Sequence, residues 1–162
     1  MNPTDRLALL QEFYREKAAL FARHQAGAEF VSDYDSNNAY QYVLAREDEH
    51  LQWLRRAIGE LGASAGELPP PPALAPGSTA EAARALAGED ARTATEFLSR
   101  WRPRVAAMTP ARDRKMLELV LGEVAEHQRF FSQAAEGRVD LLGRRPESAG
   151  TGGGVLPRRW VE

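Results

Sequence analysis

The proline-rich stretch GASAGELPPPPALAPG, residues 62–77, divides the chain into two halves. Proline lacks a backbone N–H and clashes with the preceding helical turn, so this stretch cannot be helical throughout. Where it is polyproline-like it rises about 3.1 Å per residue, and it can span roughly 40 Å, the length of a helix of about 27 residues. The sequence therefore predicts a connection that can run the whole length of a helical bundle.

Two segments with helical periodicity lie on each side of this connection. N-caps, a capping box and glycine stops set their expected ends. The predicted helices cover about 6–24, 35–61, 78–102 and 110–137, with N-caps at Thr4, Ser78 and Thr109 for the first, third and fourth. The connection between the third and fourth is short and that between the first and second is intermediate, which favours two antiparallel hairpins. An up-down-up-down bundle with an irregular central loop is the alternative.

Composition limits the function classes. The chain has 162 residues and a net charge of −2, so it lacks the excess of basic residues that would suggest nucleic-acid binding. It has no cysteine, which leaves carboxylates and three histidines as metal ligands. We see no signal peptide and no membrane span, and we expect a cytoplasmic protein. Residues 1–140 are predicted to form the bundle and 141–162 a flexible Gly/Pro-rich tail that docks through Trp160 on the body or on a partner.

The stretch EDEHLQWLRR contains the first pair of candidate ligands, Glu47 and His50. Residues three apart share one face of a helix, and these two lie on a line of apolar positions that should face inward. Asp48 and Glu49 point elsewhere and are expected at the surface. The alternative for His50 is a histidine hydrogen-bonded to a neighbouring acid.

A second Glu and His pair, Glu123 and His127, lies on the inward line of the fourth segment. Placing His127 on His50 gives a shift of 77 residues, from 127 − 50, and this shift also aligns LFARH with FLSRW. Antiparallel pairing should bring further acids to the same level, and His24 is expected to be structural and far from it. The full set of candidate ligands is Glu12, Glu16, Glu47, His50, Glu89, Asp90, Glu123 and His127.

These motifs resemble the ferritin-like superfamily, which includes rubrerythrins and other di-iron carboxylate proteins. The family pattern is one Glu from each of two helices and Glu-x-x-His from each of the other two. EDEH matches it, whereas Val124 stands where the second acid belongs. Over residues 5–137 the resemblance implies a ferritin-like four-helix bundle with a di-iron or di-manganese site, and iron oxidation or peroxide reduction as the activity of an oxidoreductase. No rubredoxin-type cysteine knuckle is present.

Two alternatives stay open at this point. DinB-like bundles hold a single divalent metal with three histidines, but Phe131 stands where the partner of His127 would lie. The other alternative is a metal-free bundle that serves as an interaction module through the proline loop or the tail. The expected partners are metal ions, a second copy of the chain in a homodimer, or a protein that binds the tail, such as a compartment that carries the chain as cargo.

Overall fold

The computed structural model describes residues 1–143, and four helices account for most of them. The helices are α1 (Pro3–Phe30), α2 (Tyr34–Gly59), α3 (Ala80–Ala106) and α4 (Ala111–Ala135). None of the described residues lies in a strand, so the all-α prediction is confirmed. No described helix is both long enough and apolar enough to cross a membrane. Most of the predicted tail, residues 144–162, lies outside the described residues.

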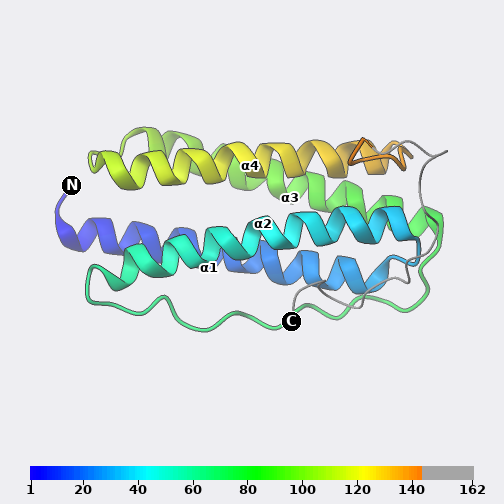
Figure 1. The fold of residues 1–162 in the computed structure, drawn as a ribbon, viewed down its shortest axis with the longest axis horizontal. Coiled ribbons are helices and arrows are strands. Elements are labelled where there is room, and N and C mark those ends of the chain that lie inside the picture. The colour runs from blue at the N-terminus through cyan, green and yellow to red at the C-terminus, as the bar shows by residue number, and fades with distance from the viewer. Residues whose placement is uncertain (144–162) are drawn as a thin grey trace.

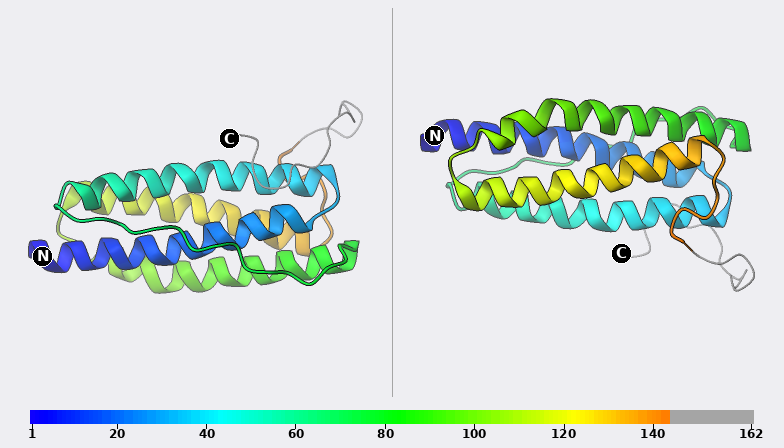
Figure 2. Two further views of the ribbon diagram at one scale, coloured as in Figure 1. Left: turned by 90° about the horizontal axis from the view of Figure 1, so that it is seen from below. Right: turned by 90° about the horizontal axis from the view of Figure 1, so that it is seen from above.

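The helices form two antiparallel hairpins that pack side by side (Figures 1 and 2). The closest packing is within the hairpins, between α1 and α2 and between α3 and α4. Between the hairpins, α1 faces α3 and α2 faces α4. Each of these neighbouring pairs is antiparallel, so α1 and α4 run in one direction and α2 and α3 in the other (Figure 1). All four helices therefore present one face to a shared interior.

The connection between α2 and α3 runs along the outside of the bundle from one end to the other (Figures 1 and 2). It is held to α1, because Gln11 donates to the Ser64 carbonyl at 3.2 Å and the Tyr14 hydroxyl donates to the Gly66 carbonyl at 3.4 Å. Its proline-rich part lies beside Ala26 and Phe30 of the same helix. This path lets α3 start at the end of the bundle where α1 meets α2.

Several predicted helix ends are wrong by one or more residues. Asn2, rather than Thr4, caps α1 and accepts from the Asp5 N–H at 2.8 Å. Thr79, rather than Ser78, caps α3. Thr109 does not cap α4, because its hydroxyl accepts from the N-terminal ammonium at 2.9 Å and Pro110 takes the N-cap position.

The end of α1 differs most from its prediction, since the helix continues six residues beyond His24 to Phe30. The added turns bury Ala26 and Ala28 against the bundle. Gly27 faces the ring of Tyr40, where a Cβ would lie 2.5 Å from the ring carbon Cε1. Glycine thus lets α1 and α2 approach closely just before their turn. In α3 the helix also continues past Pro103 to Ala106.

Aromatic side chains fill much of the core between the hairpins. The ring of Phe13 contacts Phe97 and Trp101 edge to face, with centroids 5.2 and 4.7 Å away. Trp101 is fully buried, and its indole N–H donates to Glu16 at 2.8 Å. Near the middle of the bundle, buried polar side chains interrupt this apolar packing.

Candidate functional site

A cluster of charged and imidazole side chains lies in the interior of the bundle, and we call it the central cluster. Its members come from three helices and meet at mid-length. They are Lys17 and His24 of α1, Glu47 and His50 of α2, and Glu123 and His127 of α4. All except Glu123 are at most 2% exposed. Burying so many polar groups is costly unless they are paired, so their pairing decides what the cluster can do.

Glu47 is the centre of one half of the cluster. The Lys17 ammonium donates to its Oε1 atom, and His24 donates from Nδ1 to its Oε2 atom at 2.8 Å. Because a carboxylate accepts this bond, the His24 proton sits on Nδ1. Both carboxylate oxygens of Glu47 are therefore satisfied by α1.

Glu123 is the centre of the other half. Arg46 donates two hydrogen bonds to its carboxylate, both at 2.8 Å, in the paired geometry typical of arginine and carboxylate. His50 donates from Nε2 to the same carboxylate at 2.9 Å. This half lies nearer the surface, because the side chains of Arg46 and Glu123 are 36% and 18% exposed.

Four ring nitrogens of the cluster have no hydrogen-bond partner among the described residues. They are Nε2 of His24, Nδ1 of His50, and both Nδ1 and Nε2 of His127. The rings of His50 and His127 lie 6.4 Å apart between centroids. A neutral imidazole has one nitrogen with a free lone pair, so each of the three rings could offer one nitrogen to a water molecule or a metal ion.

The electrostatics of the cluster keep its carboxylates charged, and burial disfavours the charged forms of His50 and His127. Burial alone would raise the pKa of Glu47, but His24 and Lys17 outweigh burial and hold this pKa well below its usual value. The bond from Arg46 lowers the pKa of Glu123 to about 2. Burial lowers the pKa of His50 to about 4 and that of His127 to about 3. The Lys17 and Arg46 cations face the two carboxylates. Burial lowers the pKa of Lys17, and the charge of Glu47 opposes this effect.

The other four predicted ligands point away from the central cluster. Glu12 forms a two-bond ion pair with Arg104, at 2.7 and 2.6 Å. Glu16 accepts from Trp101 at 2.8 Å and from Arg100 at 3.3 Å. These two acids of α1 were expected near the level of Glu47 and His50, but their partners are on α3, so neither joins the central cluster. The face of α1 toward α2 carries Lys17 and His24 instead.

The predicted acids of α3 also pair with α1. Glu89 accepts from Arg23 at 2.9 Å and is half exposed. Asp90 is buried, where it accepts from Arg23 and from the Tyr40 hydroxyl at 2.5 Å. Burial and this carboxylate raise the pKa of Tyr40 well above its usual value. Asp90 thus belongs to a separate group of hydrogen-bonded side chains, with Tyr40 and Arg23. The ring of Tyr40 lies 6.3 Å from the ring of His24.

The residues of the cluster do not fit a dinuclear carboxylate centre. Such a centre needs a carboxylate from each of four helices. Lys17 lies beside Glu47 at the place where α1 would have to supply a carboxylate. The positions 77 residues later, Ala94 and Val124, carry no carboxylate either. The remaining acid, Glu123, is occupied by Arg46 and His50. Within residues 1–143, no three His, Asp or Glu side chains are grouped so that they could hold a metal ion.

The sequence analysis missed two members of the cluster, Lys17 and His24, and also Arg46, which donates to Glu123. The periodicity of α1 could have revealed two of them, because Leu10, Lys17 and His24 repeat every seven residues and all lie inside. The expectation that His24 lies far from the level of Glu47 is wrong. Comparisons with known protein families, with curated proteins and with solved structures found no match to this chain.

Proposed function

We propose that this chain is a ferritin-like bundle in which the Lys17–Glu47 ion pair stands where that family holds a dinuclear metal centre. On this proposal the protein is a metal-independent binding module and not an oxidoreductase. The observation that carries it is the fully buried ammonium of Lys17 on the carboxylate of Glu47. A buried carboxylate needs a cation, and here the chain supplies its own.

Two further features support the proposal that the bundle is ferritin-like. The hairpins and the long outer connection give the order up, down, down, up, which one long crossover produces in ferritin-like folds (Figure 1). Glu47 and His50 also lie in the interior at mid-length of α2, where the family places Glu-x-x-His.

Metal analysis of the whole chain tests the metal-independent part. The protein is expressed with added iron and manganese, purified without chelator, and analysed for bound metal. We expect far less than one metal ion per chain and no change in unfolding midpoint when ferrous ion is added. About one or two equivalents of bound metal would overturn the proposal.

A charge reversal at Lys17 sharpens this test. The Lys17→Glu variant places a second carboxylate beside Glu47, and the repulsion can be relieved by a bound cation. We expect this variant to lose stability in chelator and to regain it with manganese or ferrous ion. The matched control is Lys115→Glu, at the exposed lysine of α4, which should show no metal dependence.

A second candidate is a mononuclear metal site built by the three histidines, whose side chains would have to move together because they are not grouped for metal binding among the described residues. Unpartnered nitrogens on all three rings favour it, because a neutral buried imidazole can offer one nitrogen to a transition metal. His24 would then supply the third imidazole, because α4 has Phe131 and not a histidine four residues after His127. If one equivalent of metal is found, its loss in His127→Gln and retention in Glu123→Gln would establish this candidate in place of the first.

A further inference from the structure

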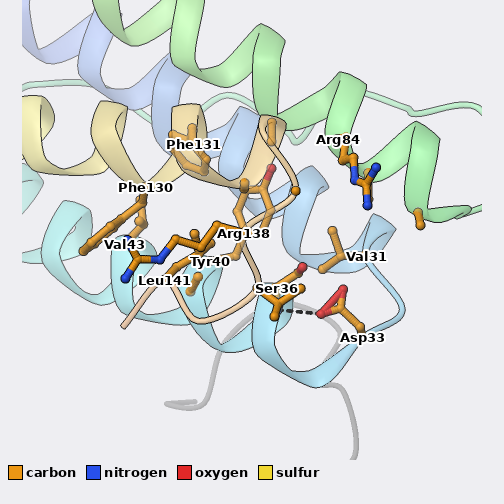
Figure 3. A pocket seen from close by; sticks show the side chains of 17 residues that line it. Val31, Asp33, Ser36, Tyr40, Val43, Arg84, Phe130, Phe131, Arg138 and Leu141 are labelled. Atoms are coloured by element: carbon orange, nitrogen blue, oxygen red, sulfur yellow. Dashed lines mark hydrogen bonds between the residues drawn. The ribbon is translucent and has the colours of Figure 1, made fainter. Parts of the chain in front are cut away.

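A cavity of about 110 Å³ opens at the end of the bundle where α1 meets α2 (Figure 3). Three helices and the segment after α4 wall it. The inner wall is apolar, with Val43 of α2, Ala83 and Ala87 of α3, and Phe130 and Phe131 of α4. Such a space takes up an apolar group readily, because little bound water has to be displaced.

The floor of this cavity is fixed by buried contacts. The Tyr40 ring forms part of it, and the Tyr40 hydroxyl is held by Asp90 at 2.5 Å. Phe131 packs between the cavity and the central cluster, with its ring 4.8 Å from that of His24. The floor is therefore preformed and does not need a ligand to order it.

The mouth of the cavity carries positive charge. Arg84 of α3 and Arg138 both line it (Figure 3). Arg138 donates to the Asp140 carbonyl at 3.2 Å. Within residues 1–143 the Arg84 guanidinium has no hydrogen bond or ion pair, unlike the arginines that pair with acids along the hairpins. Asp33, the acid at the mouth, already accepts from the Ser36 N–H at 2.8 Å.

Gly137 lies beside the Arg84 guanidinium at this mouth. Its φ of 91° lies in the left-handed region, which lets the chain turn back over the cavity after α4. A Cβ at this position would lie 3.4 Å from the guanidinium carbon of Arg84. The glycine thus both closes the cavity and leaves room for the guanidinium above it.

We propose that the cavity binds a short-chain carboxylate, with its alkyl part inside and its carboxylate on Arg84. The volume of the cavity limits the length of the alkyl chain. A cavity of about 150 Å³ in another protein holds benzene, and this cavity of about 110 Å³ should hold about four to six carbons. A guanidinium that has no partner within residues 1–143 and lies beside an apolar space matches a carboxylate, which can accept two hydrogen bonds from it. This inference names the ligand class of the proposed binding module and rests on that function.

Titration of the full chain with hexanoate tests the inference, with 1-hexanol as the neutral ligand of similar length. Methyl NMR signals of Val43, Ala83 and Ala87 report directly from the cavity wall. We expect saturable shifts of these signals with hexanoate and at least tenfold weaker binding of hexanol. Arg84→Gln should weaken hexanoate binding at least tenfold, whereas Arg92→Gln, an exposed arginine two turns further along α3, should not.

Three outcomes would overturn the inference. Equal binding of hexanoate and hexanol, or an unchanged affinity in Arg84→Gln, would show that the guanidinium recognises nothing. Cavity methyl signals that do not respond would show that this carboxylate does not enter. Contacts from Val155 or Leu156 to Ala83 in the free protein would show that the C-terminal segment of the chain itself fills the cavity. None of these outcomes changes the metal content, so the proposed function can fail or hold separately.

Discussion

Arg46 and Glu123 form a two-bond ion pair across the bundle, and they occupy the same position in the two halves of the chain. They are 77 residues apart, which is the shift that places His50 on His127. The rings of His50 and His127 also approach each other, at 6.4 Å. Two adjacent pairs of equivalent positions therefore meet between α2 and α4, as expected if the halves are related by a two-fold axis through the central cluster.

Exchanging the charges of this pair tests the internal symmetry. Arg46→Ala should lower the free energy of unfolding by about 0.5–1.5 kcal/mol, a modest loss because the arginine is 36% exposed. The double variant Arg46→Glu, Glu123→Arg should recover most of it, because the carboxylate introduced on α2 would face His127 as Glu123 now faces His50. Urea unfolding of the single and double variants measures this recovery. A double variant no more stable than Arg46→Ala would contradict the two-fold relation.

The sequence predicted which residues of α2 face the interior, but it did not predict the partners of the buried polar side chains. Glu47 and His50 share a face with Val43 and Leu54, and all four are buried, because a regular helix keeps residues three and four apart on one side. What periodicity could not give was the partner of each polar group. That depends on how far each helix is rotated toward its neighbours, and for this reason the role of Lys17 was not predicted.

The same limit explains the acids that were misplaced. Distance along the helix alone puts Glu12 and Glu16 near the level of Glu47. Their arginine and tryptophan partners on α3 are 84 or more residues away in the sequence. Helix periodicity carries no information about such long-range ion pairs, whereas the all-α fold and the long connection follow from local rules.

Removing the Lys17 ammonium should be among the most damaging single changes to stability. Lys17→Met leaves Glu47 buried with only His24 as a donor, and breaking a buried ion pair typically costs about 3–5 kcal/mol. Replacing both members, as Lys17→Met with Glu47→Leu, removes the unpaired charge and should restore much of the loss. Denaturant unfolding compares the variants, with Lys115→Met as the control. A double variant weaker than Lys17→Met would show that Glu47 does not need its cation.

Acid should destabilise the protein well above the range where carboxylates usually titrate. Burial lowers the pKa of His50 to about 4 and that of His127 to about 3 in the folded state, from 6.5 in the unfolded chain. Below pH 6.5 the unfolded chain therefore binds protons that the folded chain does not, and stability falls as the pH falls. With both histidines neutral, the slope between pH 6 and 4.5 should approach about 2.7 kcal/mol per pH unit, or two protons.

Urea unfolding at pH 7, 6 and 5 measures this slope. The carboxylates add to the loss only at lower pH, because the pKa of Glu123 is lowered from 4.5 to about 2. His50→Leu should reduce the slope between pH 6 and 5 by about one proton. The same slope in the variant and the parent would mean that His50 is already protonated in the folded protein.

The contact between Gly27 and Tyr40 gives a prediction about the turn that joins α1 to α2. In Gly27→Ala the new methyl group would lie 2.5 Å from a ring carbon of Tyr40, and the ring cannot move freely because its hydroxyl is held by Asp90. Overpacking of this kind costs about 1–3 kcal/mol, which exceeds the roughly 0.5–1 kcal/mol that alanine gains over glycine in a helix. Gly122→Ala is the matched control, since a Cβ there meets nothing within 4 Å and should stabilise the protein. Thermal unfolding of both variants separates these effects, and stabilisation by Gly27→Ala would show that the helices are not in close contact at this point.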